Sequence, residues 1–227
     1  MSSIFIADLH LDIHQPERIN AFVQFLQQQI QLVDHIYILG DLFNFWAGKA
    51  QGKLKILNKL LELLLHPKIS FLAGNRDFLF VEYLRKNHKK SLQDKDNIFI
   101  EPYNIMVAHG DCFLTDDKGY KLLKSILTSR PLFYASQIAP AFLCITVAMI
   151  IRYFSLRSKK NKIPTLKLNL DYAVDCMNEK NSNIIICGHA HLGQKYSIKN
   201  KDIYILPECK GIDFHYCLLN NQEISFI

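Results

Sequence analysis

Five short apolar runs of this sequence each end in a turn that carries a metal-capable side chain. The runs are "SIFIA", "HIYIL", "KISFLA", "YNIMVA" and "NIIIC". In α/β sheets, ligands bind beyond the carboxyl ends of the strands. If the five runs are neighbouring strands, the side chains that follow them converge on one edge: Asp8, His10, Asp41, Asn75, His109, His189 and His191. The pattern predicts an α/β fold and a metal site together.

Amphipathic stretches separate these runs in the first half of the chain. Helices are expected at 16–32, 53–65 and 78–88, and strands at 3–7, 35–39, 68–73, 97–100 and 103–108. This alternation predicts a layered α/β domain with a largely parallel inner sheet. The last third contains "NIIIC", "KYSIK", "DIYIL", "FHYCLL" and "EISFI", which are close enough in sequence to pair antiparallel. Two sheets flanked by helices are therefore expected.

The two histidine-containing turns have the same spacing. "DLH" and "GHAH" each place two candidate ligands at positions i and i+2, which lie on the same side of an extended segment. His189 and His191 could therefore aim at one point, or at two points a few ångströms apart.

The seven candidate ligands offer nitrogen and oxygen atoms but no sulfur. They are too many for one zinc ion and suit two ions with positions left open for water or substrate. Imidazole and carboxylate favour Mn²⁺, Fe²⁺, Zn²⁺ or Co²⁺. Two ions bring a charge of +4 and the carboxylates of Asp8 and Asp41 bring −2. The remaining positive charge suits the hydrolysis of a phosphate ester or anhydride.

The net charge of +6 is concentrated in one segment. Between Lys118 and Leu170 there are ten Lys or Arg and no Asp or Glu, which leaves 17 basic against 21 acidic residues elsewhere. Nucleic acid, anionic lipid or a phosphorylated substrate could each explain this charge. The apolar part, within 130–162, is about long enough to span a bilayer, but Ser136, Gln137 and Pro140 interrupt it. A helical insertion with an apolar face and a basic end is the preferred interpretation; a core helix pair is the alternative.

Composition limits the broad class of the protein. The 227 residues, 49% of them hydrophobic, predict a single domain spanning 1–227. The six cysteines are scattered without a C-x-x-C pair, and the first residues have no signal-peptide pattern, so we expect a reducing cytoplasm.

The motifs "DLH", "GDLFN", "GNRD", "HGD" and "GHAH" together resemble the calcineurin-like metallophosphoesterases. The resemblance implies an α/β/β/α sandwich of four layers, with two mixed sheets and a helical lid insertion. It also implies the ligand sets: Asp8, His10 and His191 for one metal, Asn75, His109 and His189 for the other, and Asp41 bridging them.

Longer stretches, among them "YILGDLFNFW" and "HGDCFLTDDKGY", resemble the lipid A branch of this family. That branch splits the pyrophosphate of UDP-2,3-diacylglucosamine to lipid X and UMP, with Mn²⁺, at the cytoplasmic face of the inner membrane of Gram-negative bacteria. The resemblance implies a lid at 121–167 that holds acyl chains, a lipid-linked UDP-sugar as substrate and contact with the membrane surface. No nucleic acid is expected as a partner. "PECKGIDFHY" departs from the glycine-tryptophan stretch usual in this branch, and Leu192 stands where the branch often has Arg.

The resemblance also assigns roles to individual residues. The catalytic residues would be Asp41, Asn75, Arg76, His109 and His189. The substrate would contact Asn75, Arg76, Asp117, Tyr120 and His189, with Arg157, Ser158, Thr165 and Lys167 as candidates in the lid. Arg76 can clamp a phosphate as a fork but cannot donate a proton as His can, which suits a phosphate leaving group.

Other functions remain open at this point. A related phosphodiesterase acting on nucleotides or on a different lipid-linked diphosphate, or a nuclease, would use the same site. A protein phosphatase is disfavoured because "GDLFNFW" lacks the G-D-x-x-D-R-G pattern. A silent, membrane-bound adaptor would not need the complete ligand set.

Overall fold

The computed structural model describes residues 2–46, 48–88, 97–113, 146 and 169–227. The predicted lid at 121–167 lies outside the described residues apart from Thr146. So do six of the predicted substrate contacts: Asp117, Tyr120, Arg157, Ser158, Thr165 and Lys167. Within the described ranges, no helix is both long enough and apolar enough to cross a membrane.

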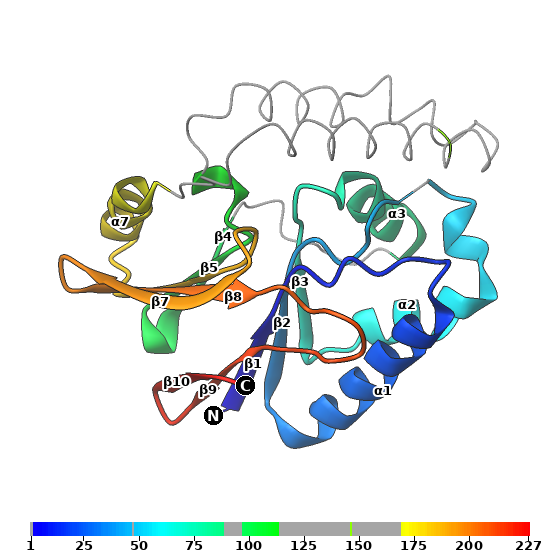
Figure 1. Cartoon of the computed structure of the whole chain (residues 1–227), viewed down its shortest axis with the longest axis horizontal. Coiled ribbons are helices and arrows are strands. Elements are labelled where there is room, and N and C mark those ends of the chain that lie inside the picture. Colours follow the sequence, from blue (N-terminus) through cyan, green and yellow to red (C-terminus); the bar gives the residue numbers. More distant parts are fainter. Residues whose placement is uncertain (1, 47, 89–96, 114–145, 147–168) are drawn as a thin grey trace.

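In the described part of the chain, two five-stranded mixed sheets form the centre (Figure 1). The first has the strand order β10-β9-β1-β2-β3 and the second β4-β5-β6-β8-β7. The strands of the first sheet are β1 (Ser2–Ile6), β2 (His35–Leu39), β3 (Ile69–Leu72), β9 (Cys217–Asn220) and β10 (Glu223–Phe226). Those of the second are β4 (Asn97–Ile100), β5 (Ile105–Ala108), β6 (Ile184–Cys187), β7 (Leu192–Ile198) and β8 (Lys201–Pro207).

Each sheet contains three neighbouring parallel strands, which are central in the second sheet and end at the edge strand β3 in the first. β1, β2 and β3 run parallel, as do β5, β6 and β8, while β4, β7, β9 and β10 pair antiparallel with their neighbours. The expected antiparallel pairing of the C-terminal strands is therefore confirmed for β7–β8 and β9–β10 and wrong for β6–β8. Among the described strands, β7 lies at the edge of the sheet and pairs only with β8, so that β8 is the strand beside β6.

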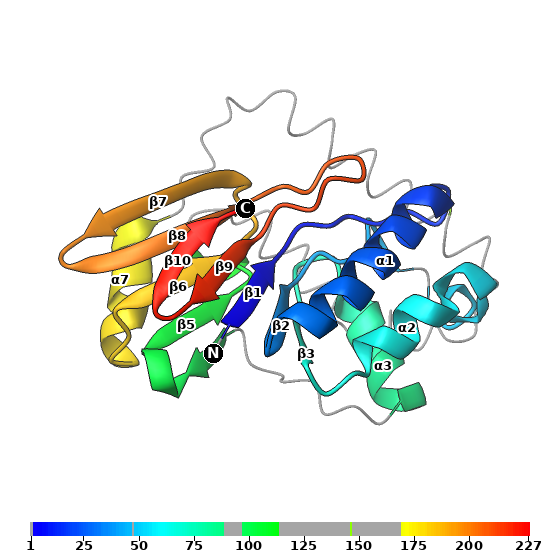
Figure 2. The ribbon, with the colours of Figure 1, turned by 90° about the horizontal axis from the view of Figure 1, so that it is seen from below.

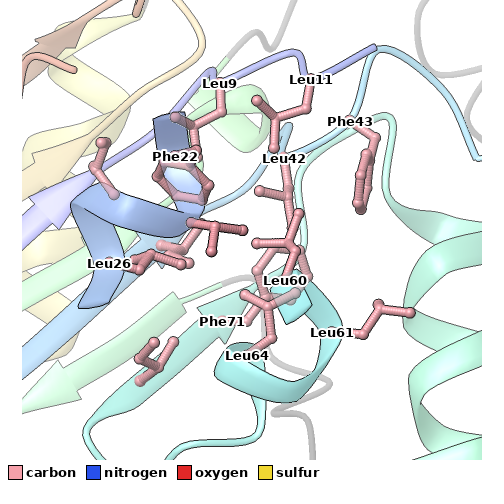
Figure 3. Close-up of a cluster of buried hydrophobic side chains, with 14 of the residues drawn as sticks. Leu9, Leu11, Phe22, Leu26, Leu42, Phe43, Leu60, Leu61, Leu64 and Phe71 are labelled. Carbon is pink, nitrogen blue, oxygen red and sulfur yellow. The ribbon is translucent and has the colours of Figure 1, made fainter. Parts of the chain in front are cut away.

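Helices cover the outer face of each sheet, which gives the predicted four layers (Figures 1 and 2). Over the first sheet lie α1 (Pro16–Leu32), α2 (Asn58–Leu64) and α3 (Phe78–His88), and over the second lies α7 (Leu170–Glu179). Buried side chains of α1 and α2 pack on the first sheet in one cluster (Figure 3). Side chains of α7 pack on the second sheet in another cluster.

The alternation of side chains along each strand separates these layers. In β1, Ile4 and Ile6 belong to the cluster under the helices, whereas Phe5 belongs to the cluster between the sheets. Period-2 alternation of this kind, with both faces apolar, requires a strand covered on both sides. The first sheet is therefore packed on both faces, and this packing fixes the positions of the carboxyl ends of its strands.

The helix predicted at 53–65 is shorter than expected. Residues Gln51–Lys53 and Lys55–Leu57 form two 3₁₀ turns, and α2 begins only at Asn58. Leu54 between the turns has extended backbone angles, so helical hydrogen bonding cannot continue through it. The helices at 16–32 and 78–88 are confirmed. The strand predicted at 103–108 begins at Ile105, after a 3₁₀ turn.

Candidate metal centre

The turns that follow the strands are held together by backbone hydrogen bonds. The nitrogen of Asp8 donates to the carbonyl of Gly40 at 3.1 Å, and that of His10 donates to the carbonyl of Asp41 at 2.9 Å. Between the turns of the second sheet, the nitrogen of Gly188 donates to the carbonyl of His109 at 2.9 Å. The side chains on these turns are therefore positioned by the sheets.

Five of the seven candidate ligands have left-handed backbone angles, with φ between 48° and 67°: Asp8, His10, Asp41, His189 and His191. Among residues other than Gly, Asn, Asp and His adopt this region most readily, but it still costs energy and persists only where the surroundings hold it. The extended geometry expected for the i and i+2 pairs is therefore wrong. The chain turns sharply at the end of each strand; Asp8 and His10 still reach one group of side chains, whereas His189 and His191 reach two.

Asp8, His10 and His191 form the first group of side chains. Each offers one ligand atom, and these atoms lie within 4.8 Å of one another. Nε2 of His191 is 3.2 Å from Oδ1 of Asp8, and the rings of His10 and His191 are 5.5 Å apart between centroids. Asp8 is fully buried and His10 is 8% exposed. This grouping is the one that the family resemblance implies.

Asn75, His109 and His189 form the second group. Nε2 of His109 lies 3.1 Å from Oδ1 of Asn75 and 3.2 Å from Nδ1 of His189. The other ring nitrogen of His109, Nδ1, is 2.8 Å from the carbonyl oxygen of Leu39. If Nδ1 carries the proton and donates to that carbonyl, the lone pair of Nε2 faces the other two ligand atoms.

Asp41 lies between the two groups. Its Oδ1 is 3.5 Å from Nε2 of His109, and its Oδ2 is 3.9 Å from Nδ1 of His10. Asp41 and His109 also form a set of possible ligands with Asp8, with ligand atoms within 4.8 Å of one another. The structure thus brings all seven predicted ligands together, with one carboxylate facing both groups.

The surroundings lower the pKa of one carboxyl group and of two imidazoles in the site. Burial alone would raise the pKa of Asp8, but the contact with His191 and the other imidazoles lower it to about 2. Burial and then the charge of Arg76 lower the pKa of His10 to about 3. Burial and then His109 lower the pKa of His189 to about 3. At neutral pH the site therefore presents an ionised Asp8 and neutral imidazoles at His10 and His189.

Two further histidines respond to the carboxylates around them. Burial opposes protonation of His109, but the charges of Asp41 and Asp8 outweigh it and raise its pKa. Burial likewise opposes protonation of His191, and Asp8 and Glu208 raise its pKa. Burial raises the pKa of Asp41. In the absence of a metal cation, the negative charge of these carboxylates favours protonation of the neighbouring imidazoles.

The buried nitrogens of His10 indicate what the site is built to hold. Neither Nδ1 nor Nε2 of His10 has a hydrogen-bond partner among the described residues, although both atoms are buried. Unpaired buried polar atoms are costly in a native fold and call for a missing ligand. A divalent cation would satisfy the imidazole, and the nitrogen and oxygen donors fit Mn²⁺, Fe²⁺, Co²⁺ or Zn²⁺.

Arg76 lies beside Asp41, with a side chain that is 31% exposed. Its Nε is 3.2 Å from Oδ2 of Asp41, and its Nη1 donates to Oδ1 of Asn44 at 3.5 Å. Asn44 in turn donates to Asp12 at 3.1 Å. The predicted phosphate-binding side chain is therefore at the site, held by a short polar chain.

Two residues near the ligands were not included in the predicted site. The carboxylate of Asp77 accepts hydrogen bonds from the nitrogens of Asp41 and Gly74. Oε2 of Glu208 is 3.5 Å from Nδ1 of His191. Glu208 directly follows the apolar run "IYILP", so the rule that located the other turns also applies to it.

The comparisons with known proteins place these motifs in one family. The family model described as calcineurin-like phosphoesterase matches residues 1–193. A UDP-2,3-diacylglucosamine hydrolase from Psychromonas ingrahamii is 32% identical over 199 residues, which are 84% of this chain and 81% of that protein. The protein of the same name from Proteus mirabilis is 28% identical over 93% of this chain and 90% of its own length. That from Histophilus somni is 32% identical over 83% of both chains.

Proposed function

The chain belongs to the calcineurin-like phosphoesterase family, and from this premise we propose that it hydrolyses the diphosphate of UDP-2,3-diacylglucosamine. The products would be UMP and 2,3-diacylglucosamine 1-phosphate, which is lipid X. The observation that carries the proposal is the convergence of all seven candidate ligand side chains at the strand ends, in a chain that matches relatives of that name over most of its length.

Two divalent metal ions would be held by the two groups of side chains. Asp8, His10 and His191 would bind one ion, and Asn75, His109 and His189 the other. Asp41 would bind both, because one of its oxygens faces each group. We propose Mn²⁺ as the native ion, as the resemblance to the lipid A branch implies; oxygen and imidazole nitrogen donors without thiolate are compatible with it.

Bound divalent ions supply Lewis acidity, which polarises a phosphoryl oxygen and makes water a better nucleophile near neutral pH. The side chains of this protein bind the ions and orient the substrate. Asp8 stays ionised and His10 stays neutral at that pH, so both can bind a cation without first losing a proton. Arg76 would bind oxygens of the diphosphate and orient it, as a guanidinium does in a fork.

The reaction requires little acid catalysis from the protein. Water adds to one phosphorus, the bridging P–O bond breaks, and the bond electrons leave with a phosphate group. A phosphate leaving group needs little protonation. Arg76 is permanently charged and cannot donate a proton, so its presence at the site is compatible with such a leaving group. His189 lies beside His109 and would help bind the negative charge that develops on the phosphoryl oxygens.

The composition of the segment 118–170 supports a lipid-linked substrate. It is basic and apolar together, as a two-chain lipid diphosphate at an anionic membrane surface requires. The relatives come from Gram-negative bacteria. We therefore propose a peripheral position on the cytoplasmic face of the inner membrane, with the predicted lid at 121–167 over the acyl chains.

The experiment that tests the proposal is hydrolysis of UDP-2,3-diacylglucosamine in mild detergent, with added Mn²⁺ and with EDTA. Release of UMP that requires Mn²⁺ is the expected result. Absence of UMP, together with metal-dependent cleavage of bis(p-nitrophenyl) phosphate, would reject this substrate and keep the two-metal site. Absence of both activities in folded, metal-loaded protein would reject the enzyme itself.

A further inference from the structure

We propose that Glu208 is a positioning residue for His191, and that its carboxylate raises the affinity of the Asp8, His10 and His191 group for its metal ion. The inference rests on the proposed two-metal function. It concerns a residue in "PECKGIDFHY", the stretch in which this chain departs from the pattern of the branch it resembles.

The pairing of β7 with β8 brings the two residues together. Leu192 is the register partner of Pro207 in this antiparallel pair. His191 precedes Leu192 and Glu208 follows Pro207, so the next position of the ladder places them opposite each other. Because β8 also runs parallel to β6, its carboxyl end lies at the same edge as the other ligand turns.

The contacts divide the two ring nitrogens of His191 between two carboxylates. Nε2 lies 3.2 Å from Oδ1 of Asp8, and Nδ1 lies 3.5 Å from Oε2 of Glu208. A proton on Nδ1 that points at Glu208 leaves the lone pair of Nε2 facing Asp8 and the first group. This is the arrangement in which a carboxylate outside the ligand set fixes the tautomer and ring orientation of a metal-binding histidine.

The charge of Glu208 acts on the metal through the imidazole. A carboxylate at Nδ1 makes Nε2 more basic and so a stronger ligand, and loss of such a partner typically weakens metal binding by about 10–100-fold. Both side chains are about one third exposed, at 30% for His191 and 33% for Glu208. Lys210 lies 3.6 Å from the same oxygen of Glu208, and its own side chain is 80% exposed.

The test is a titration of the metal-free full-length protein with Co²⁺ and with Mn²⁺. Co²⁺ reports ligand geometry through its visible absorption, and equilibrium dialysis against Mn²⁺ counts bound ions. The wild type is expected to bind two ions. Glu208→Ala should weaken one of them by about 10–100-fold and change the Co²⁺ spectrum of that ion alone. Glu208→Gln keeps an acceptor without the charge and should recover part of the loss.

Two matched variants separate this effect from a general loss of charge. Lys210→Gln removes the exposed partner of Glu208 and should leave both affinities within about twofold of wild type. Glu62→Gln removes an exposed carboxylate on α2 and should do the same. Circular dichroism checks that each variant folds. If Glu208→Ala does not fold, Glu208→Gln and Glu208→Asp are titrated in its place and must still weaken one ion.

Wild-type affinities for both ions in Glu208→Ala would overturn the inference, and so would an equal loss for both ions. The titration contains no lipid, so it does not depend on the substrate assignment. A wild-type protein that binds fewer than two ions would defeat the two-metal proposal as well. Two ions in the wild type and an unaltered Glu208→Ala variant would defeat this inference alone.

Discussion

Oδ2 of Asp77 accepts a hydrogen bond of 2.6 Å from the backbone nitrogen of Asp41. The same oxygen accepts a second bond of 2.9 Å from the nitrogen of Gly74. Asp77 is fully buried, and it precedes the first residue of α3. One carboxylate therefore ties the turn after β2, which carries Asp41, to the turn after β3, which carries Asn75.

Replacing Asp77 tests whether this tie holds the ligands in place. Asp77→Ala leaves two buried N–H groups without an acceptor, and each such loss costs about 1–3 kcal/mol. We expect the free energy of unfolding to fall by about 2–6 kcal/mol, with loss of most of the activity. Urea unfolding and the rate of hydrolysis measure the two effects.

Asp77→Asn is the matched variant for this prediction. Burial, and then the charge of Asp41, raise the pKa of Asp77 to about 7, so the native carboxyl is only partly ionised at neutral pH. An amide oxygen can still accept both hydrogen bonds. We expect this variant to keep most of its stability, and a loss as large as that of Asp77→Ala would contradict the role assigned to the hydrogen bonds.

Gly188 lies directly against Asp8. A Cβ atom at this position would be 2.6 Å from Oδ2 of Asp8 and 2.6 Å from Cβ of Ala7, closer than such atoms approach one another. Gly188→Ala must therefore displace Asp8 or the turn. We expect weaker binding of one metal ion and a loss of about 1–3 kcal/mol in unfolding free energy, as for other overpacked sites.

Gly211→Ala is the control for Gly188→Ala. No atom lies within 4 Å of a Cβ at Gly211, whose φ is +59°. The strain of a left-handed alanine costs about 1 kcal/mol, without any effect on the metal site. Metal affinity is measured by equilibrium dialysis, and equal losses in the two variants would show that crowding of Asp8 is not the cause.

The strand ends could be located from the sequence because two simple rules apply to them. Apolar runs of four to six residues identify the strands, and parallel strands bring their carboxyl ends to one edge. These rules placed Asp8, Asp41 and His109 in one site without any contact information. The same rules would also have found Glu208 at the end of β8, had the sixth run been treated like the other five.

Other features depend on contacts that the sequence does not display. The left-handed angles of Asp8 and His10 accompany hydrogen bonds from their nitrogens to a turn that is distant along the chain. The first of the two 3₁₀ turns before α2 contains Gly52, whose backbone packs against the ring of Tyr83 and accepts a hydrogen bond from its hydroxyl. The helical periodicity of residues 53–65 gives no information on tertiary contacts or on the extended backbone at Leu54, and so the predicted helix was too long.

Arg76 is proposed to bind the diphosphate, and Arg76→Lys tests that role. Lysine keeps the charge but loses the planar fork, so kcat/KM should fall by about 10–100-fold. The backbone nitrogen of Arg76 donates to Oδ1 of Asp41 at 3.0 Å, and this bond survives the substitution. Metal content and the melting temperature should therefore change little, and an equal loss of metal would show that Arg76 acts on the ligands instead.

The stability of the metal-free protein should fall on acidification because of His10. Its pKa is about 3 in the folded chain against an ordinary 6.5, owing to burial and to the charge of Arg76. Between these values the unfolded chain binds a proton that the folded chain does not. The free energy of unfolding therefore falls by up to about 1.4 kcal/mol for each pH unit below 6.5.

His10→Asn cannot take up that proton and provides the comparison. Urea unfolding of both proteins in EDTA, at pH values from 7.5 to about 5, should give a steeper decline for the wild type. Parallel curves would mean that His10 is not held neutral by its surroundings. Only the difference between the curves is informative, because His109 and His191 have raised pKa values and act in the opposite sense.

Asp41 offers the sharpest test of a paired metal site, because one of its oxygens faces each group. Asp41→Asn keeps the size of the side chain, and its amide oxygen can still accept the 3.0 Å bond from the nitrogen of Arg76. The fold should therefore persist. Electrostatic stabilisation by bound ions is worth several kcal/mol, so we expect activity to fall by about 100-fold or more.

Electron paramagnetic resonance of the Mn²⁺-loaded protein distinguishes a bridging carboxylate from a ligand to one ion. Two Mn²⁺ ions that share Asp41 should give an exchange-coupled spectrum in the wild type. Asp41→Asn should give the spectrum of isolated ions, or lose one ion. Asp171→Asn, which changes an exposed carboxylate on α7, should retain the coupled spectrum. A coupled spectrum of undiminished intensity in Asp41→Asn would show that the two groups are bridged by something other than this side chain.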